Sequence, residues 1–275
     1  MSSGFHLDTG GRGVRHRPED LPAVPKVNGS RVWSPSLKLD LPDPDAVHPS
    51  ATSSLTRPPP GDPDASVLGR WARRGIWLLP VYALLLALST LTHQPDYTTD
   101  FGDYAKYVTT GQFLASHLVA SILGSGLGVV GTVALSVLLA RGRSATPAML
   151  GLICTLVGNV LFTAIFAAAA FAQPAVGEAW LGGAHGVARS VNSDVYGPPL
   201  FATFAVGAPL FIAGAIFLGV AVVRHDSNLR WQGIGYAVSL PLFLVAGFLF
   251  DIVQPVMALF LLVATLSIAR RLQHG

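Results

Sequence analysis

The first candidate for chemistry is the stretch "GSGLGVVG", in which Gly126, Gly128 and Gly131 have the G-x-G-x-x-G spacing of a dinucleotide-binding loop. That spacing holds a pyrophosphate only between a strand and a helix, with an acidic residue about 20 positions later to bind the ribose. The sequence has no Asp or Glu between Asp103 and Glu178, and the glycines lie inside a long apolar segment. We therefore expect no dinucleotide cofactor there.

Three histidines, His93, His117 and His185, are the weak candidates for metal or haem ligands. No pair of them has the i, i+4 spacing of two ligands on one helix face, and "LGGAHGVARS" predicts a flexible loop around His185. The only cysteine, Cys154, excludes an intrachain disulfide and a Cys-x-x-Cys motif. We therefore expect no bound metal and no cofactor.

Three polar residues in or beside apolar segments form a possible polar site: His117, Asn159 and Asp251. Asn159, in "TLVGNVLFT", is the deepest of them. Its side chain is either a hydrogen-bond donor between helices or a ligand for a substrate. An ion-coupled transporter or an intramembrane protease is expected to have charged or catalytic groups near the membrane midplane, and the sequence has none there. No hydrolase, kinase or glycosyltransferase motif occurs, so we expect no enzyme.

Composition determines the surroundings of these residues. The 275 residues are 51% hydrophobic and 12% charged, with a mean hydropathy of +0.52, whereas soluble domains carry about 25% charged residues. Several segments approach or exceed the ~20 apolar residues that cross a membrane. The sequence predicts an all-α fold, a multi-pass transmembrane helix bundle. The first apolar segment begins too late for a cleaved signal peptide.

Six membrane spans are predicted within a transmembrane domain of residues 70–275. The last two are short and joined by "DIVQP"; the alternative is a re-entrant hairpin after four spans, but Arg270 and Arg271 favour a full exit. The predicted spans are 75–92, 113–140, 149–172, 200–223, 233–250 and 256–269.

Basic residues predict the orientation, because short cytoplasmic loops are enriched in them. With six spans, nine arginines fall on one side: Arg70, Arg73, Arg74, Arg141, Arg143, Arg224, Arg230, Arg270 and Arg271. Both termini are then cytoplasmic. Arginine outnumbers lysine and Ala and Gly are abundant, a usage typical of GC-rich bacterial genomes, so we expect a multi-pass protein of a bacterial plasma membrane.

Residues 1–69 differ from the rest. They hold eleven of the 20 prolines and no hydrophobic periodicity, which predicts a disordered, cytoplasmic, Pro-rich tail. The alternative is a docking tail with "TRPPPGDP" as a polyproline ligand.

Small residues in the second span predict a packing face, because helices in lipid associate through small side chains. The face, at helical spacing, consists of Ser121, Gly124, Ser125, Gly128 and Thr132. Its neighbour is another span of this chain, which we favour, or a second copy.

Prolines within spans, Pro80, Pro209 and Pro241, free a backbone carbonyl and kink a helix. Such interruptions form substrate sites in transporters; the alternative is a static kink.

Two long outer segments, 94–112 and 173–199, are read as loops that bind a partner or cation or cap the bundle. Their candidate binding residues are Asp96, Asp100, Asp103, His185, Arg189 and Asp194.

Three functions follow from these patterns. The first is a non-enzymatic structural or accessory component of a membrane or envelope complex. The second is a small-solute transporter or channel that uses spans four and five. The third is a metal- or haem-binding redox protein. The expected partners are the lipid bilayer and other membrane proteins or a second copy, with no nucleic acid.

Overall fold

The structure, a computed structural model, describes residues 67–92, 94–246 and 252–274. Within these ranges the chain is helical and contains no β-strand. The predicted N-terminal tail up to residue 66, His93 and Asp251 lie outside the described residues.

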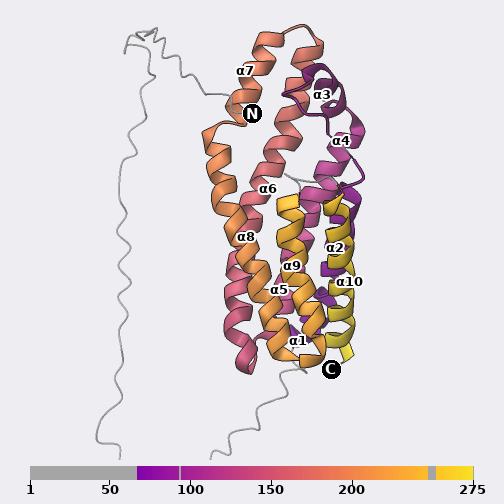
Figure 1. Cartoon of the computed structure of the whole chain (residues 1–275), viewed down its shortest axis with the longest axis vertical. Coiled ribbons are helices and arrows are strands. Elements are labelled where there is room, and N and C mark those ends of the chain that lie inside the picture. Colours follow the sequence, from indigo (N-terminus) through magenta and orange to yellow (C-terminus); the bar gives the residue numbers. More distant parts are fainter. Residues whose placement is uncertain (1–66, 93, 247–251, 275) are drawn as a thin grey trace, which may run out of the picture. The chain divides into compact units, whose positions relative to one another are not determined.

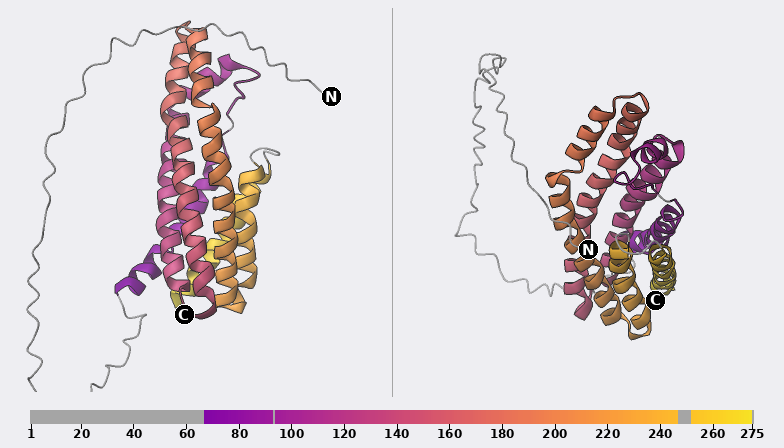
Figure 2. Two further views of the ribbon diagram at one scale, coloured as in Figure 1. Left: turned by 90° about the vertical axis from the view of Figure 1, so that its left-hand side faces the viewer. Right: turned by 45° about the horizontal axis from the view of Figure 1, so that its top comes forward.

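Six helices form a closed ring in which each helix contacts the next and the last returns to the first. Neighbouring helices in the ring run in opposite directions (Figures 1 and 2). In ring order the helices are α2 (Leu78–Ser89), α5 (Gly124–Leu139), α6 (Ala145–Leu181), α8 (Pro198–His225), α9 (Arg230–Ala246) and α10 (Val253–His274). We call the end that carries the end of α10 the inner end and the opposite end the outer end.

Shorter helices complete the bundle at both ends. At the inner end, α1 (Val67–Gly75) precedes α2 and packs against α5. At the outer end, α3 (Phe101–Val108) and α7 (His185–Val195) pack against α6 (Figure 1). The second predicted span begins as α4 (Gly111–Ala115), continues as a π-helix (Ser116–Leu123) and then becomes α5. Two 3₁₀ turns, Gly142–Ser144 and Ser227–Leu229, precede α6 and α9.

Five helical stretches are long and apolar enough to cross a membrane: Val67–Ser89, Gly111–Leu139, Gly142–Leu181, His185–His225 and Val253–His274. Large apolar side chains also cover the outside of the ring, among them Leu88, Ile153, Val160, Leu259, Phe260 and Val263. Helices that are apolar on both faces are typical of a lipid environment. The chain is therefore an all-helical protein with five candidate membrane spans; six were predicted, and α9 has 17 described residues.

Glycines bring the ring helices into backbone contact. A Cβ atom on Gly158 of α6 would lie 2.8 Å from the backbone nitrogen of Phe211 in α8, and one on Gly151 would lie 2.9 Å from that of Leu218. Gly219 of α8 and Gly233 of α9 face each other's backbone in the same way. Close approach at small residues is the main route by which helices associate in lipid.

The outer segment 173–199 is mostly helical, so its prediction as a loop is wrong. Helix α6 continues through Pro174 to Leu181, and α7 follows after a turn in which Gly183 has a φ of +88°. Tertiary packing explains the extension: Val176 is buried, and a Cβ on Gly177 would lie 2.8 Å from the Ala105 carbonyl oxygen of α3. The predicted loop 94–112 likewise contains α3.

The three prolines of the predicted spans occupy different positions. Pro80 lies in the first turn of α2, just after the break between α1 and α2. The Ile76 carbonyl, four residues before this proline, accepts a hydrogen bond from the Leu79 N–H instead (3.1 Å). Pro209 and Pro241 lie inside α8 and α9.

Candidate functional site

A cavity of about 820 Å³ lies inside the outer half of the ring. Every ring helix contributes to its wall, and the connections at the outer end of α2 and before α8 complete it. The lining residues include Tyr82, Leu86, Ser89, Ser125, Asn159, Phe162, Phe166, Phe201, Phe204, Phe211, Phe243, Leu244 and Gln254. Its volume lies in the range of pockets that bind small molecules, about 300–1,000 Å³.

Phenylalanines of α6 and α8 form one wall of the cavity. The ring of Phe162 lies 5.4 Å from that of Phe211 and 5.8 Å from that of Phe204, both edge-to-face, and 6.1 Å from that of Phe166. Such pairs hold one another in a defined orientation. This wall is apolar, and it suits the hydrocarbon part of a bound molecule.

Asn159 is the deepest amide group in the cavity. Only 3% of the residue is exposed, and its Nδ2 donates a hydrogen bond to the Thr155 carbonyl at 3.1 Å. Its Oδ1 accepts no hydrogen bond from any residue in the described ranges. Because Asn159 lines the cavity, this oxygen is a ready acceptor for a donor on a bound molecule. None of the described lining residues is charged.

The π-helix places one more polar group at the cavity. Residues Ser116–Leu123 have the wider π-helical turn, and Ser121 in this segment lines the cavity beside Ser125. π-helical segments are rare and often occur at functional sites. Because the π turn shifts the rotation of the residues that follow, it sets which face of α5 points into the ring.

The outer rim of the cavity is polar and aromatic. Tyr97 and Tyr196 line it, and their rings stack at a centroid distance of 6.1 Å. The Gln173 side-chain amide donates to the Tyr196 hydroxyl, and Gln94 donates to the Gln173 oxygen at 3.4 Å. These four residues come from the segments that were read as outer loops. The rim could contact the polar end of a molecule whose apolar part lies deeper.

The predicted packing face lies against α2 of the same chain. A Cβ on Gly124 would lie 3.6 Å from Leu85, and one on Gly128 would lie 3.0 Å from the Tyr82 ring. The other three members of the face divide between the cavity and the core: Ser121 and Ser125 line the cavity, and Thr132 is buried.

The three glycines with dinucleotide-loop spacing lie within one helix and have different surroundings. Gly126 has no atom within 4 Å of an added Cβ, whereas Gly131 approaches the backbone nitrogen of Leu79 at 2.9 Å. The middle glycine is the one that faces the Tyr82 ring. All three lie in α5, where no strand-to-helix turn occurs.

The predicted polar site is divided. Asn159 lines the cavity, whereas His117 does not appear in its wall. The Nδ1 atom of His117 lies 3.0 Å from the Phe113 carbonyl oxygen, and the two rings are 4.1 Å apart. The third member, Asp251, lies outside the described residues.

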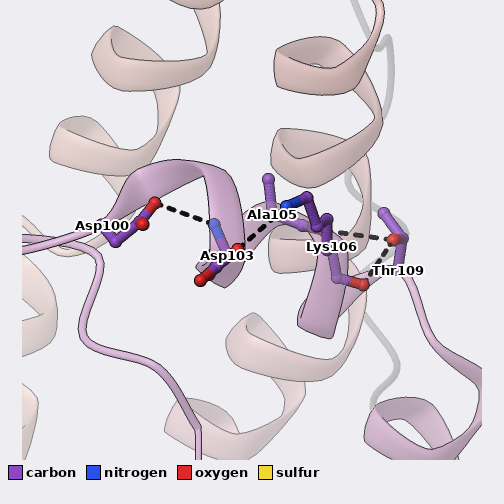
Figure 3. Close-up of polar contacts among 5 residues, drawn as sticks. All are labelled: Asp100, Asp103, Ala105, Lys106 and Thr109. Carbon is purple, nitrogen blue, oxygen red and sulfur yellow. Dashed lines mark hydrogen bonds and ion pairs between the residues drawn. The ribbon is translucent and has the colours of Figure 1, made fainter.

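The acidic residues of α3 take part in local hydrogen bonds (Figure 3). Asp100 caps the helix by accepting from the Asp103 N–H at 2.9 Å, and Asp103 pairs with Lys106 at 2.9 Å. Thr109 ends the helix, since its hydroxyl donates to the Ala105 carbonyl at 3.1 Å and to that of Lys106 at 2.9 Å. These contacts shape α3 itself.

Asp96 stabilises the turn before α3. Its carboxylate accepts from the Thr98 N–H and hydroxyl, each at 2.8 Å, and these hydrogen bonds lower the pKa of Asp96, the backbone one most. A partner or cation would have to compete with Thr98 for these oxygens.

Two of the remaining outer candidates, His185 and Arg189, lie against the Trp180 ring. The Arg189 guanidinium lies 5.0 Å from the Trp180 ring and 5.3 Å from the Phe101 ring, and His185 stacks on Trp180 at 4.2 Å. Asp194 lies in the last turn of α7. In the described part of the chain, no three His, Cys, Asp or Glu side chains come close enough together to hold a metal ion.

The cavity phenylalanines were missed by sequence reasoning, although a signal for them exists. Phe162 and Phe166 are four residues apart in α6, and Phe204 and Phe211 are seven apart in α8, so each pair lies on one helix face. Aromatic residues in a membrane span look like lipid-facing or packing residues until their faces are known to converge.

Comparison with known proteins adds no family to these observations. No protein-family model, no curated protein and no solved structure matches the chain. The cavity and the charges at the inner end are therefore the basis for inferring function.

Proposed function

We propose that this chain is a multi-pass protein of a bacterial plasma membrane, with six helices crossing the bilayer and both termini in the cytoplasm. The sixth crossing is supported by α9, which completes the ring between α8 and α10. Its 17 described residues span about 25 Å at ~1.5 Å per residue, and the sequence stays apolar to Phe250. The nine arginines lie at the inner ends of the helices, as the excess of basic residues in cytoplasmic loops requires.

The protein, in this proposal, is not an enzyme and binds a neutral, lipid-like molecule in the cavity of the ring. The observation that carries the proposal is the Asn159 oxygen, which lines an uncharged, phenylalanine-rich cavity and accepts no hydrogen bond in the described part of the chain. A hydrogen bond from a ligand to this oxygen contributes a net free energy of about 0.5–1.5 kcal/mol.

The cavity chemistry defines the class of ligand. The ligand carries a hydroxyl or amide N–H that donates to Asn159, a branched or cyclic hydrocarbon body that packs on Phe162 and Phe211, and no net charge. Burying an unpaired charge among these residues would cost several kcal/mol or more. Pro209 and Pro241 lie within two residues of Phe211 and Phe243 on the cavity wall, so a bend at either proline would change the cavity and make transport of the ligand possible.

A second candidate, an accessory role in a membrane or envelope complex, is favoured by the outer extension of the bundle. Helix α6 has 37 residues and is about 55 Å long, well beyond a ~30 Å hydrocarbon core. Leu181, Val187 and Val191 are exposed on the hairpin that α6 forms with α7. They offer an apolar contact to another membrane protein or a second copy.

Co-purification tests the proposed ligand. We expect the full chain, extracted in mild detergent, to retain one neutral amphiphile per protein in native mass spectrometry, and a solvent extract to identify it. The share of this amphiphile in the extract of the purified protein should exceed its share of the membrane lipids by at least tenfold.

The control for this experiment is an unrelated multi-pass protein extracted from the same membranes. Enrichment of the same molecule on both proteins, or recovery of bulk phospholipid alone, would contradict a ligand site in the cavity. The accessory role would then be the better proposal.

A further inference from the structure

A second pocket, of about 450 Å³, lies at the inner end of the bundle. Its charged and titratable lining comes from four separate parts of the chain: Arg73 of α1, Arg141 after α5, His225 and Asp226 at the end of α8, and Arg271 and His274 of α10. The fold therefore gathers residues that are up to about 200 positions apart into one basic pocket.

Positive charge dominates this pocket. Three arginines and one aspartate line it, and Asp226 accepts a hydrogen bond from the Arg271 Nε at 3.3 Å. Asp226 also accepts from the Asn228 N–H at 2.9 Å. The Asn228 backbone hydrogen bond is the main cause that lowers the pKa of Asp226, and Arg271 adds to it, so the carboxylate stays ionised at neutral pH. Three cations and one anion leave a net charge of +2 from these four groups.

The pocket also has an apolar side. Leu138 and Leu272 lie in its wall next to the arginines, at the level where the apolar parts of α5 and α10 end. A site lined by both guanidinium groups and leucine side chains matches the boundary between headgroups and acyl chains. Basic pockets between helices on the cytoplasmic side of a membrane are typical binding places for anionic headgroups.

We propose that this inner pocket binds the phosphate headgroup of an anionic phospholipid, with Arg73, Arg141 and Arg271 as its ligands. Guanidinium groups suit phosphate because they donate two parallel hydrogen bonds to its oxygens. Asp226 orients Arg271 and offsets part of the positive charge. The pocket therefore binds one headgroup with moderate affinity. This proposal does not depend on a ligand in the outer cavity.

Lipid titration distinguishes a headgroup from free phosphate. The full chain is placed in phosphatidylcholine nanodiscs, and phosphatidylglycerol, phosphatidylcholine or inorganic phosphate is added in separate arms. We expect one phosphatidylglycerol to be retained per protein in native mass spectrometry, with an affinity that falls as salt rises. Equal retention of the two lipids would overturn the proposal, and so would displacement of phosphatidylglycerol by inorganic phosphate at millimolar concentration.

Charge variants test the residues. Arg73→Gln and Arg141→Gln should each weaken phosphatidylglycerol binding about fivefold, because one cation near a membrane surface contributes about that much. The matched control is Arg143→Gln, which removes an exposed arginine of the same end that does not line the pocket; its binding should be unchanged.

Asp226→Asn is expected to change the affinity for phosphatidylglycerol in the opposite direction from the arginine variants. This variant therefore separates an effect of charge from a loss of structure. Asparagine keeps the cap that residue 226 provides for the turn Ser227–Leu229, while the pocket loses its negative charge. We expect the affinity for phosphatidylglycerol to rise about fivefold with the thermal midpoint little changed. Weaker binding by Asp226→Asn would contradict the proposal.

Discussion

Gly158→Ala is expected to lower the free energy of unfolding by about 3 kcal/mol, at the upper end of the cost of overpacking. The new Cβ would lie 2.8 Å from the Phe211 backbone nitrogen and 3.0 Å from its Cα. Backbone atoms cannot rotate away as a side chain does, so α6 and α8 would have to separate along their whole contact. The midpoint of thermal unfolding in detergent should fall by about 6–12 °C.

Gly126→Ala is the matched control, because it makes the same chemical change in a membrane helix. An added Cβ at Gly126 meets no atom within 4 Å, and alanine is the better helix former. Its midpoint should be equal to or slightly above that of the unchanged protein. Similar midpoints for Gly158→Ala and Gly126→Ala would mean that α6 and α8 are not in backbone contact.

Asn159→Leu should reduce the occupancy of the proposed cavity ligand by about tenfold to a hundredfold at fixed ligand concentration. Leucine has the branched shape of asparagine and the same number of side-chain heavy atoms, although its methyl groups are larger. The cavity therefore stays largely open, but the donor of the ligand is left buried without an acceptor. The cost of such an unpaired group is about 1–3 kcal/mol. The measurement is the fraction of protein that retains the ligand in native mass spectrometry.

Two further variants separate the hydrogen bond from the cavity itself. Thr203→Val changes a half-buried position of α8 that does not line the cavity and whose hydroxyl donates to the Pro199 carbonyl. The occupancy of the ligand in this variant should be unchanged. Ser121→Trp fills part of the cavity and should remove the ligand. Full retention by both Asn159→Leu and Ser121→Trp would place the ligand elsewhere.

Hydropathy predicted most of the helical architecture, because the bilayer demands apolar helices of a minimum length. The hydropathy-based prediction was wrong where tertiary contacts determine the end of a helix. The third span was predicted to end at residue 172, yet α6 continues through Pro174 to Leu181 because Gly177 packs on α3. A sequence shows where an apolar run stops, but it does not show which neighbour stabilises the polar turns beyond it.

The glycines show the same limit. A small-residue face was predicted around Gly124 and Gly128, and these residues lie against α2. The tighter contacts, at Gly151 and Gly158 of α6, were not considered, although their spacing of seven residues places them on one face. Composition of one helix identifies a possible contact face, whereas the choice among faces depends on the partner helix.

Of the candidate site, only Asn159 and part of the small-residue face were identified in advance. Its phenylalanines belong to helices that meet only in the folded ring, and the π-helix that turns Ser121 toward the cavity has no sequence signature. The inner pocket was closer to prediction, since its arginines had already been assigned to one side of the membrane. Their convergence with Asp226 required the closed order of the helices.

Cysteine labelling tests the central claim, that six helices cross the membrane around the cavity. In a Cys154→Ser background, Ile252→Cys lies in the turn between α9 and α10, two residues before the cavity residue Gln254. Thr98→Cys is the control for the outer side and Ser227→Cys for the inner side; all three positions are exposed. We predict that a membrane-impermeant maleimide added to intact cells labels positions 98 and 252, and labels 227 only after permeabilisation. Position 252 protected in intact cells and labelled only after permeabilisation would contradict six crossings.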